Sequence, residues 1–198
     1  MWDERYAKDG FLFGTEPAAF LTAAISYLKE PSRVLCVADG EGRNSVYLAQ
    51  QGHAVTAFDA SQVGLDKAMG LARHRDVRVD YHLSTVADWD WDQTYDAVVA
   101  IFIQFLAPEE RAEAFDAFRR AVRPGGLLML HGYAPRQVDY GTGGPPLRAH
   151  MYTEDLLEAQ FSDWQILRLA DYDAVLSEGP GHSGRSGLVD LIARRTQD

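Results

Sequence analysis

Short apolar runs alternate with amphipathic stretches through the first half of the chain. The runs have strand length and are mostly apolar, which is typical of strands covered on both faces. We expect three such strands, at Arg33–Ala38, Ala54–Asp59 and Tyr95–Phe102. The stretches between them have helical spacing: one spans Arg43–Gln51, and another is capped by Ser61 and runs to about Arg73.

The second half continues this pattern less regularly. Val77–Leu83 alternates apolar and polar residues as a strand does, and Pro108 opens a helix that Pro124-Gly125-Gly126 should end. Thr153 caps a short helix that runs to Phe161. The remaining strands are expected at Leu127–His131, Trp164–Leu169 and Leu188–Ala193.

Two segments stand apart from this alternation. Before the first strand, a short lead rich in aromatic residues is followed by a helix over about Pro17–Leu28. Gly132–Met151 is rich in glycine and proline and has no regular pattern. A loop of that length in a compact domain is usually functional or mobile.

The order of strands and helices predicts the fold class. Repeated βα units imply an α/β protein with a mostly parallel, Rossmann-like sheet and helices on both faces. We expect one domain over residues 1–198, in which residues 1–31 form an N-terminal lid and helix and residues 32–198 form the core.

Composition narrows the classes of function. The chain has 198 residues, of which 46% are hydrophobic, and a formal net charge of −10, so the basic face of a nucleic-acid binder is not expected. It has no apolar stretch of membrane-spanning length, and its N-terminus lacks a signal-peptide layout, so we expect a cytoplasmic protein. Cys36 is the only cysteine, and no histidine pair has metal-ligand spacing, so neither a disulfide nor a metal is expected.

The turn after the first strand carries the clearest chemical signal. Gly40 and Gly42 lie where an open α/β sheet binds its ligand, and glycine lets a ligand approach the backbone. Asp59 ends the second strand, where a carboxylate can accept hydrogen bonds from ribose hydroxyls. The alternative is a structural turn accompanied by a surface aspartate.

The charge of this turn favours S-adenosylmethionine (SAM) over a dinucleotide. A pyrophosphate would meet Asp39 and Glu41, with a repulsion of ~1–4 kcal/mol for each charge pair about 4 Å apart. Ser45 also replaces the third glycine of the dinucleotide fingerprint. SAM has no phosphate, and its sulfonium and ammonium suit an acidic turn. Arg43 offsets part of this argument, because it could neutralise one carboxylate.

The sequence resembles the class I SAM-dependent methyltransferases. Within them it resembles the small bacterial branch related to tellurite-resistance and thiol methyltransferases. The resemblance covers nearly the whole chain and implies a seven-stranded sheet whose last strand is antiparallel. The matching signatures are Trp2–Tyr6, Phe13–Pro17, Gly40–Asn44, Tyr140–Pro145 and Glu178–His182.

The resemblance also implies roles in cofactor binding. Ala38, Asp39 and Gly40 would line the methionine moiety of SAM, and Ile101 would lie beneath it. The other expected contacts are Asp59 to the ribose, Ala60, Ala87 and Asp88 to the adenine, and Trp2, Arg5 and Tyr6 closing from the N-terminal segment. That segment could equally be an apolar anchor that only docks the N-terminus.

The acceptor side departs from the relatives. Gln104 stands where histidine is common after the fourth strand, and His131 where glutamate is common after the fifth. Both are catalytic candidates, although a buried structural role for His131 is slightly favoured. The resemblance places further residues near the acceptor, namely Phe105, Tyr133, Arg136, Tyr140 and His182.

The sequence therefore predicts a SAM-dependent methyltransferase, with S-adenosylhomocysteine as product, acting on a small molecule, with a thiol or metalloid considered first. Ile101–Phe105 lacks the Asn/Asp-Pro-Pro-aromatic motif of enzymes that methylate the amines of nucleic-acid bases. A non-catalytic SAM-binding protein and an NAD-dependent oxidoreductase remain as alternatives. We expect a monomer or weak dimer that binds neither nucleic acid nor membranes.

Overall fold

The computed structural model describes residues 1–29 and 31–197 and confirms the predicted α/β fold. Seven strands form one sheet in the order β3-β2-β1-β4-β5-β7-β6. The pairs β1–β2, β2–β3 and β4–β5 are parallel, whereas β7 is antiparallel to both β5 and β6. The antiparallel β7 is the feature that the resemblance implied.

The chain divides into two compact units. The first contains Met1–Trp89 and Glu178–Gly181, and the second contains Asp90–Ser177 and the described residues from His182 onward. The predicted single domain over residues 1–198 stays a prediction.

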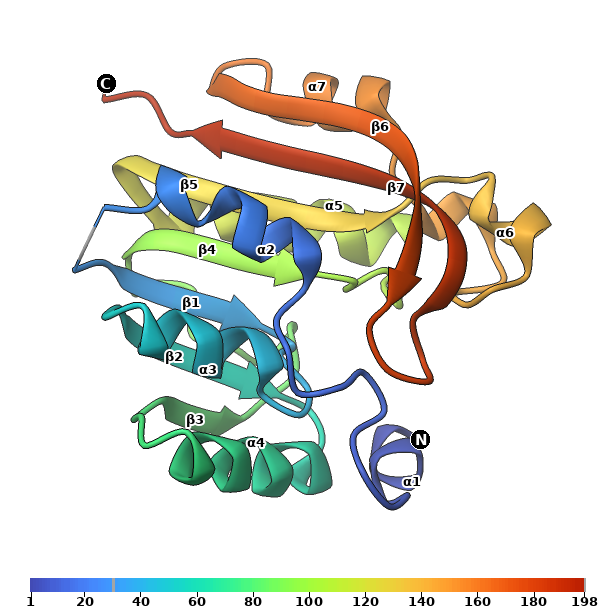
Figure 1. Ribbon diagram of the computed structural model, residues 1–198. Coiled ribbons are helices and arrows are strands. Elements are labelled where there is room, and N and C mark those ends of the chain that lie inside the picture. Colours follow the sequence, from blue (N-terminus) through green and yellow to red (C-terminus); the bar gives the residue numbers. More distant parts are fainter. Residues whose placement is uncertain (30, 198) are drawn as a thin grey trace. The chain divides into compact units, whose positions relative to one another are not determined.

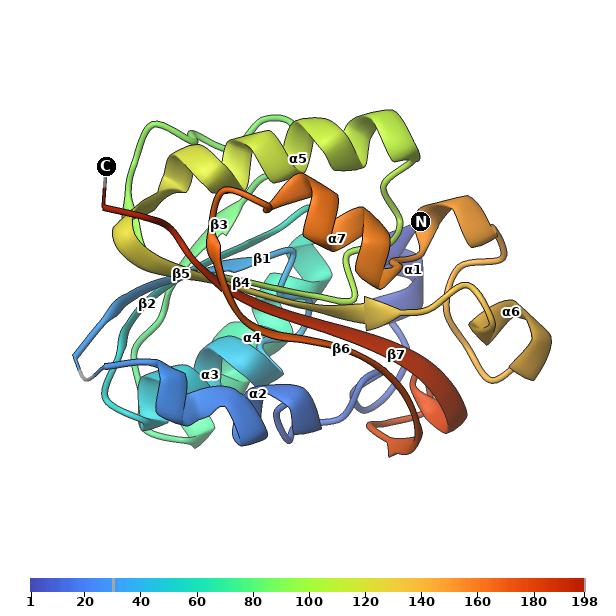
Figure 2. The same ribbon diagram turned by 90° about the horizontal axis from the view of Figure 1, so that it is seen from above.

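The first unit packs helices onto a parallel three-stranded segment. Its elements are α1 (Trp2–Tyr6), α2 (Ala19–Ala24), the 3-10 helix η1 (Ile25–Tyr27), β1 (Arg33–Val37), α3 (Arg43–Gln50), β2 (Ala54–Asp59), α4 (Gln62–His74) and β3 (Asp80–Leu83). Figures 1 and 2 show α3 and α4 on one face of these strands. The Ser61 hydroxyl caps α4 by accepting from the Gly64 N–H at 3.0 Å, as its sequence position predicts.

Gly42 sets how closely α3 and α4 pack. It has φ +89°, a left-handed conformation that favours glycine, and α3 begins immediately after it. A Cβ on Gly42 would lie 2.6 Å from the Cβ of Ala68 in α4. The second glycine of the turn is therefore explained by helix packing.

The second unit contains four strands with helices between them. Its elements are β4 (Tyr95–Ile101), α5 (Pro108–Ala121), β5 (Val122–Tyr133), α6 (Gln137–Tyr140), the 3-10 helix η2 (Arg148–His150), α7 (Glu154–Gln160), β6 (Gln165–Ser177) and β7 (Ser183–Arg194). Figures 1 and 2 show α5 and α7 on the same face of this unit's strands. The Thr153 hydroxyl caps α7 as predicted, accepting from the Leu156 N–H at 3.2 Å.

Several boundaries differ from the sequence prediction. The helix expected over Pro17–Leu28 is shorter, and β3 starts at Asp80 instead of Val77. Pro124-Gly125-Gly126 does not follow the end of α5 directly but lies inside β5, because Val122 is already extended. Backbone hydrogen bonds of Gly125 and Gly126 with Arg195, both 2.9 Å, hold this segment in place.

The last two strands are much longer than predicted. β6 and β7 pair from Gln165–Arg194 to Ser177–Ser183, well beyond the expected apolar runs. The sequence understated β6 because Asp171 and Asp173 interrupt its apolar pattern. In the structure both carboxylates are neutralised by Arg136.

Candidate functional site

The turn that follows β1 is held in a strained conformation. Ala38 has φ +48°, which is uncommon for a residue other than glycine, and Gly40 has φ +62°. Such strain is often found at functional sites, where the surrounding structure maintains it. No local sequence pattern indicates this backbone strain at Ala38.

Asp59 lies beside this turn, at the end of β2. Its Oδ2 accepts from the Gly40 N–H at 2.8 Å, and its Oδ1 accepts from the Ser61 N–H at 2.9 Å. Burial raises the pKa of Asp59, and these backbone hydrogen bonds oppose the rise. The carboxylate is thus fixed against the turn, and each oxygen retains further acceptor capacity.

Asp39 has a carboxylate oxygen with no hydrogen-bond partner. Its Oδ1 accepts from the Ser45 N–H at 3.3 Å, whereas its Oδ2 is buried and unpaired. Burial, reinforced by the charge of Asp59, raises the pKa of Asp39 to about 7. A buried oxygen of this kind is stabilised by a cationic or hydrogen-bond-donating group.

Glu41 does not contribute to ligand electrostatics as the sequence suggested. Its carboxylate is 3% exposed and accepts from the backbone N–H groups of Leu12 and Phe13 at 2.7 and 3.4 Å. Its other oxygen pairs with Lys67 Nζ at 2.9 Å. Glu41 therefore fastens the N-terminal segment, and the acidic character of the turn rests on Asp39 and Asp59.

Arg43 neutralises a different carboxylate from those of the turn. It pairs with Glu178 at 2.8 Å, and both side chains are almost fully buried. Glu178 also accepts from the Ala19 N–H at 3.0 Å. The neighbouring Gly179 lies so close to Gly14 that an added Cβ would be 2.4 Å from the Gly14 nitrogen. Two of the sequence signatures thus interlock around the start of α3, which accounts for them structurally.

The helix α1 covers the glycine turn. Tyr6 is 4% exposed, and a Cβ on Gly40 would lie 2.7 Å from its hydroxyl oxygen. Trp2 stacks on Tyr6 with ring centroids 5.5 Å apart, and the guanidinium of Arg5 lies 4.5 Å from the Trp2 ring centroid. Of the three lid residues predicted, Tyr6 lies directly against the turn.

Two side chains fix this lid to α4. Asp3 accepts from the Ser61 hydroxyl and from the Val63 N–H, the latter at 3.3 Å. Lys67 Nζ donates to the carbonyls of Lys8 and Gly10 at 2.9 and 2.6 Å. The segment is therefore anchored, as one of the two predicted readings requires, and also lies over the turn, as the other requires.

The residues predicted to contact adenine are solvent-accessible. Ala60, Ala87 and Asp88 are all exposed. The Asp88 carboxylate accepts from the Thr85 hydroxyl at 2.6 Å within its own turn. Their role in adenine binding stays a prediction.

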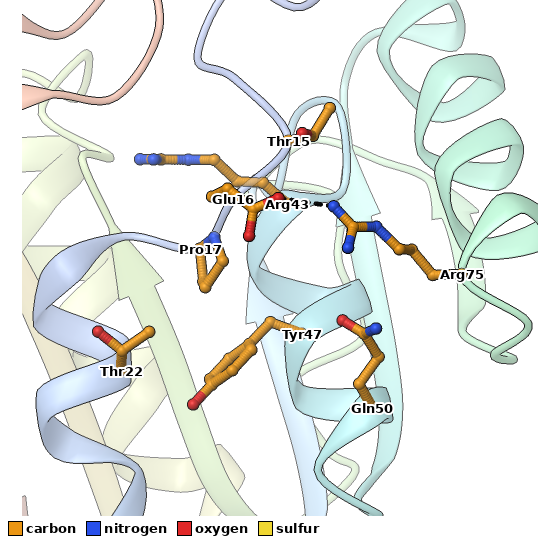
Figure 3. A pocket seen from close by; sticks show the side chains of 8 residues that line it. All are labelled: Thr15, Glu16, Pro17, Thr22, Arg43, Tyr47, Gln50 and Arg75. Atoms are coloured by element: carbon orange, nitrogen blue, oxygen red, sulfur yellow. Dashed lines mark hydrogen bonds and ion pairs between the residues drawn. The ribbon is translucent and has the colours of Figure 1, made fainter.

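A cavity of about 240 Å³ is lined mainly by residues of α3 and of the N-terminal segment through α2. Figure 3 shows Arg75 reaching Glu16 across one end of it, an ion pair of 2.6 Å. Its lining residues are Thr15, Glu16, Pro17, Thr22, Arg43, Tyr47, Gln50 and Arg75. No residue predicted to bind cofactor or acceptor lines this cavity.

In the second unit, His131 belongs to a buried polar network. Its Nδ1 lies 2.7 Å from Oδ1 of Asp190, and both side chains are about 2% exposed. The Tyr172 hydroxyl donates to the same Oδ1 at 3.1 Å, and Arg168 donates to Oδ2 from Nε at 2.9 Å and from Nη2 at 2.8 Å. His131 is thus oriented by a carboxylate that is itself held on both oxygens.

Gln104 is used to support the backbone. Its Nε2 donates to the Tyr133 carbonyl at 2.7 Å, and its Oε1 accepts from the Tyr133 N–H at 2.6 Å. Both ends of the amide are engaged, which favours a structural role over the catalytic one considered from the sequence. Ile101 ends β4 opposite His131 in the strand register, and Phe105 is 42% exposed beyond it.

An aromatic cluster centred on Phe102 lies against His131. Phe102 has φ +57° and its ring centroid lies 4.8 Å from that of His131, 4.7 Å from Tyr133 and 4.1 Å from His182. Tyr133 and His182 were predicted near the acceptor, and the structure brings both together with His131. Phe102 was not among the candidates, because the sequence does not reveal its backbone strain.

Arg136 and Tyr140 lie in a surface ion cluster. Arg136 pairs with Asp171 at 2.5 Å and with Asp173 at 2.7 Å, and the Tyr140 hydroxyl donates to Asp173 at 2.7 Å. Arg185 joins the same carboxylate at 2.7 Å. These bonds favour a role in ordering the loop that was predicted over Gly132–Met151.

Residues 1–29 and 31–197 contain neither a metal-binding cluster nor a membrane-spanning helix. No group of three or more His, Cys, Asp or Glu side chains there is arranged to hold a metal ion. No helix in the same residues combines the length and apolar character needed to cross a membrane.

Comparison with known proteins finds similarity to methyltransferases. A family model described as a methyltransferase domain matches residues 34–126. The chain is 37% identical over 158 residues to the ubiquinone biosynthesis O-methyltransferase of Rickettsia felis, covering 75% of this chain and 62% of that protein. It is 30% identical over 163 residues to the glycine/sarcosine N-methyltransferase of Halorhodospira halochloris, covering 72% and 55% respectively. The chain is similar to class I SAM-dependent methyltransferases.

Solved structures of other proteins have the same fold as this chain. The TehB protein of Haemophilus influenzae superposes with a TM-score of 0.73 at 19% identity, covering 98% of this chain and 66% of that one. The chain spans between 33% and 62% of the length of the curated relatives it matches.

The residues of the first unit fit SAM, the methyl donor of this family. Asp39 offers an unpaired buried oxygen to the ammonium. Asp59 retains acceptor capacity for ribose hydroxyls.

Sequence reasoning missed two charged residues that contribute contacts in this chain. Asp190 is a lone acid within the buried run Leu188–Ile192, and that isolation was the signal that could have revealed it. Lys67 gave no comparable signal, because its partners lie far away in the sequence.

Proposed function

We propose that this protein transfers a methyl group from SAM to a small-molecule acceptor. The observation that carries the proposal is the buried, unpaired oxygen of Asp39 beside the turn that Asp59 holds. An ionised Asp39 would bind the ammonium of SAM, and Asp59 would bind the ribose hydroxyls. When bound, SAM supplies an electrophilic methyl group.

The N-terminal lid would contribute by excluding water. Aromatic faces stabilise nearby cations by ~0.5–2 kcal/mol, and a dry site strengthens every electrostatic contact within it. Trp2 and Tyr6, which stack on each other in the lid, would supply these aromatic faces. Lys67 would hold the lid near the turn through its bonds to the Gly10 carbonyl and Glu41.

The acceptor is proposed as a class rather than a compound. The resemblance to tellurite-resistance and thiol methyltransferases favours a thiolate or reduced metalloid, which needs little help from a base. The R. felis relative is named as an O-methyltransferase, and a hydroxyl acceptor requires removal of a proton. The His131–Asp190 pair, described above, favours the hydroxyl.

The donor is tested by calorimetric titration with SAM, S-adenosylhomocysteine and NADH. We expect the first two to bind and NADH not to bind. Asp59→Asn keeps the size of the side chain but replaces one acceptor oxygen with a donor, and should weaken SAM binding at least about tenfold, or about 1.4 kcal/mol. Asp66→Asn, an exposed position on α4, is the matched control and should change nothing.

Catalysis is tested separately from binding. Labelled SAM is incubated with thiols, selenite, tellurite and small phenols, and transfer of label is measured. Tight NADH binding without SAM binding would contradict the donor assignment. Binding of SAM without transfer to any member of the panel would favour a non-catalytic SAM-binding protein.

A further inference from the structure

A charged residue lies within the buried run of β7 in the second unit. Asp190 is 1% exposed within β7, where its neighbours Val189 and Leu191 are both fully buried. Removing a carboxylate from water costs several kcal/mol unless other groups compensate it. A residue with this cost needs either a complete set of partners or a role that requires its charge.

The partners of Asp190 come from both neighbouring strands. His131 on β5 is its register partner and shares Oδ1 with Tyr172 of β6. Arg168 of β6 binds Oδ2 through two nitrogens. Asp190 is thus held rigidly by β6 and presents a fixed acceptor to the imidazole on β5.

This arrangement determines the tautomer of His131. A carboxylate bound by a guanidinium only accepts hydrogen bonds, so the hydrogen in the 2.7 Å contact must belong to Nδ1 of His131. In the neutral ring the lone pair then resides on Nε2. Fixing a histidine in this tautomer beside a carboxylate is how general-base histidines are prepared.

We propose that Asp190 is a positioning residue that holds His131 as the proton acceptor for an aromatic hydroxyl substrate. The proposal rests on the proposed function and names its substrate class. The Phe102 ring packs against the imidazole of His131, and Tyr133 and His182 pack against Phe102. Aromatic contacts of this kind favour an aromatic acceptor over an aliphatic one.

The proposed reaction is an O-methylation accompanied by proton transfer to His131. The O–H bond of the acceptor breaks as its O–CH₃ bond forms, with SAM supplying the methyl group and leaving as S-adenosylhomocysteine. The proton passes to Nε2 of His131, and Asp190 stabilises the imidazolium until the proton is released to water.

The groups facing His131 are consistent with this transfer. Asp190 of β7 supplies the negative charge, and Arg168 of β6 binds the oxygen remote from the imidazole. Tyr172 stays a neutral donor, because burial and the charge of Asp190 raise its pKa. Phe102 adds an uncharged ring, and the titratable ring of His182, on the segment before β7, packs against Phe102.

The first test reads the tautomer without turnover. Nitrogen-15 spectra of the imidazoles, assigned by loss of one signal in His131→Gln, should show His131 protonated on Nδ1. Asp190→Asn can donate to Nδ1 and should shift the hydrogen to Nε2. A wild-type His131 protonated on Nε2 would overturn the proposal even if the variant fails to fold.

The second test varies the acidity of the acceptor. Phenol, whose pKa resembles the ~10 of tyrosine, needs a base, whereas 4-nitrophenol is largely ionised at the assay pH. Asp190→Asn should lower kcat for phenol about 10²- to 10³-fold and affect 4-nitrophenol far less. Tyr172→Phe removes one hydrogen bond to Asp190 and should cost about fivefold or less for phenol.

The outcomes separate this inference from the proposed function. If SAM binds and thiophenol or tellurite is methylated but no phenol is, the substrate class is wrong while the proposed function stands. If Asp190→Asn slows both phenols equally, Asp190 is only structural. Failure of SAM to bind the wild-type protein rejects the proposed function itself.

Discussion

At the scale of single residues, Asp39 and Asp190 are both buried acids but differ in how their charge is met. Asp190 has partners on both oxygens, whereas Asp39 leaves Oδ2 unpaired. An unpaired buried acid is retained only where a ligand or another function compensates its cost. The difference supports the proposed roles, in which Asp39 binds SAM and Asp190 acts through His131.

Asp39→Asn should therefore make the free protein more stable while weakening SAM binding. Its pKa is raised from 3.8 to about 7, so the ionised form destabilises the fold above pH 7, and this penalty disappears as the pH falls toward 4. We expect a gain on the order of 2–4 kcal/mol at pH 8 and little at pH 4.5. Chemical unfolding at both pH values measures the gain.

The matching ligand experiment uses the same titration. Wild-type affinity for SAM should rise with pH through about 7, because only the ionised carboxylate attracts the ammonium. Methylthioadenosine lacks that ammonium and serves as the control, with no such dependence expected. An equal pH dependence for both ligands would remove Asp39 from the ammonium site.

At the scale of elements, α1 illustrates how a short helix of five residues can be fixed. A helix this short is unstable alone, so its position depends on Asp3, Tyr6 and the Lys67–Glu41 pair. The sequence predicted an aromatic lead and left open whether it was lid or anchor. Lys67 connects the two roles, because it bonds both the lead and the glycine turn.

Lys67→Met should loosen the lead and reveal which role dominates. We expect faster hydrogen exchange at the Leu12 and Phe13 amides, which Glu41 now binds, and a three- to thirtyfold loss of SAM affinity, about 0.7–2 kcal/mol. Arg73→Met, an exposed cation on the same helix, is the control. Faster exchange with unchanged affinity would make the segment an anchor only.

At the scale of the whole molecule, ligand binding should be visible as stability. A ligand that binds only the native state at 100 times its Kd adds about 2.7 kcal/mol, or roughly 5–10 °C in a domain of this size. SAM and S-adenosylhomocysteine should raise the unfolding midpoint by this amount, and NADH should not. A similar rise with NADH in a thermal scan would argue for a dinucleotide site.

Local pattern predicted the elements well where burial was uniform. The boundaries of β1, β2, β4 and α4 differ from prediction by one residue or none, because strands covered on both faces and a capped helix have strong sequence signals. β6 was understated because the acids that interrupt it are neutralised by Arg136, a residue in a different element. Such compensation depends on the folded chain and leaves no local pattern.

By itself, the sequence determined the parallel βα order, the glycine turn and the presence of an acid at the end of β2. It also gave the resemblance that named the methyl donor. Only the tertiary structure decided what each charged side chain does: Glu41 fastens the lead, Gln104 supports the backbone, and Asp190 orients His131. The physical reason is that a carboxylate's role is set by its partner and burial, and His131 and Asp190 are 59 residues apart along the chain.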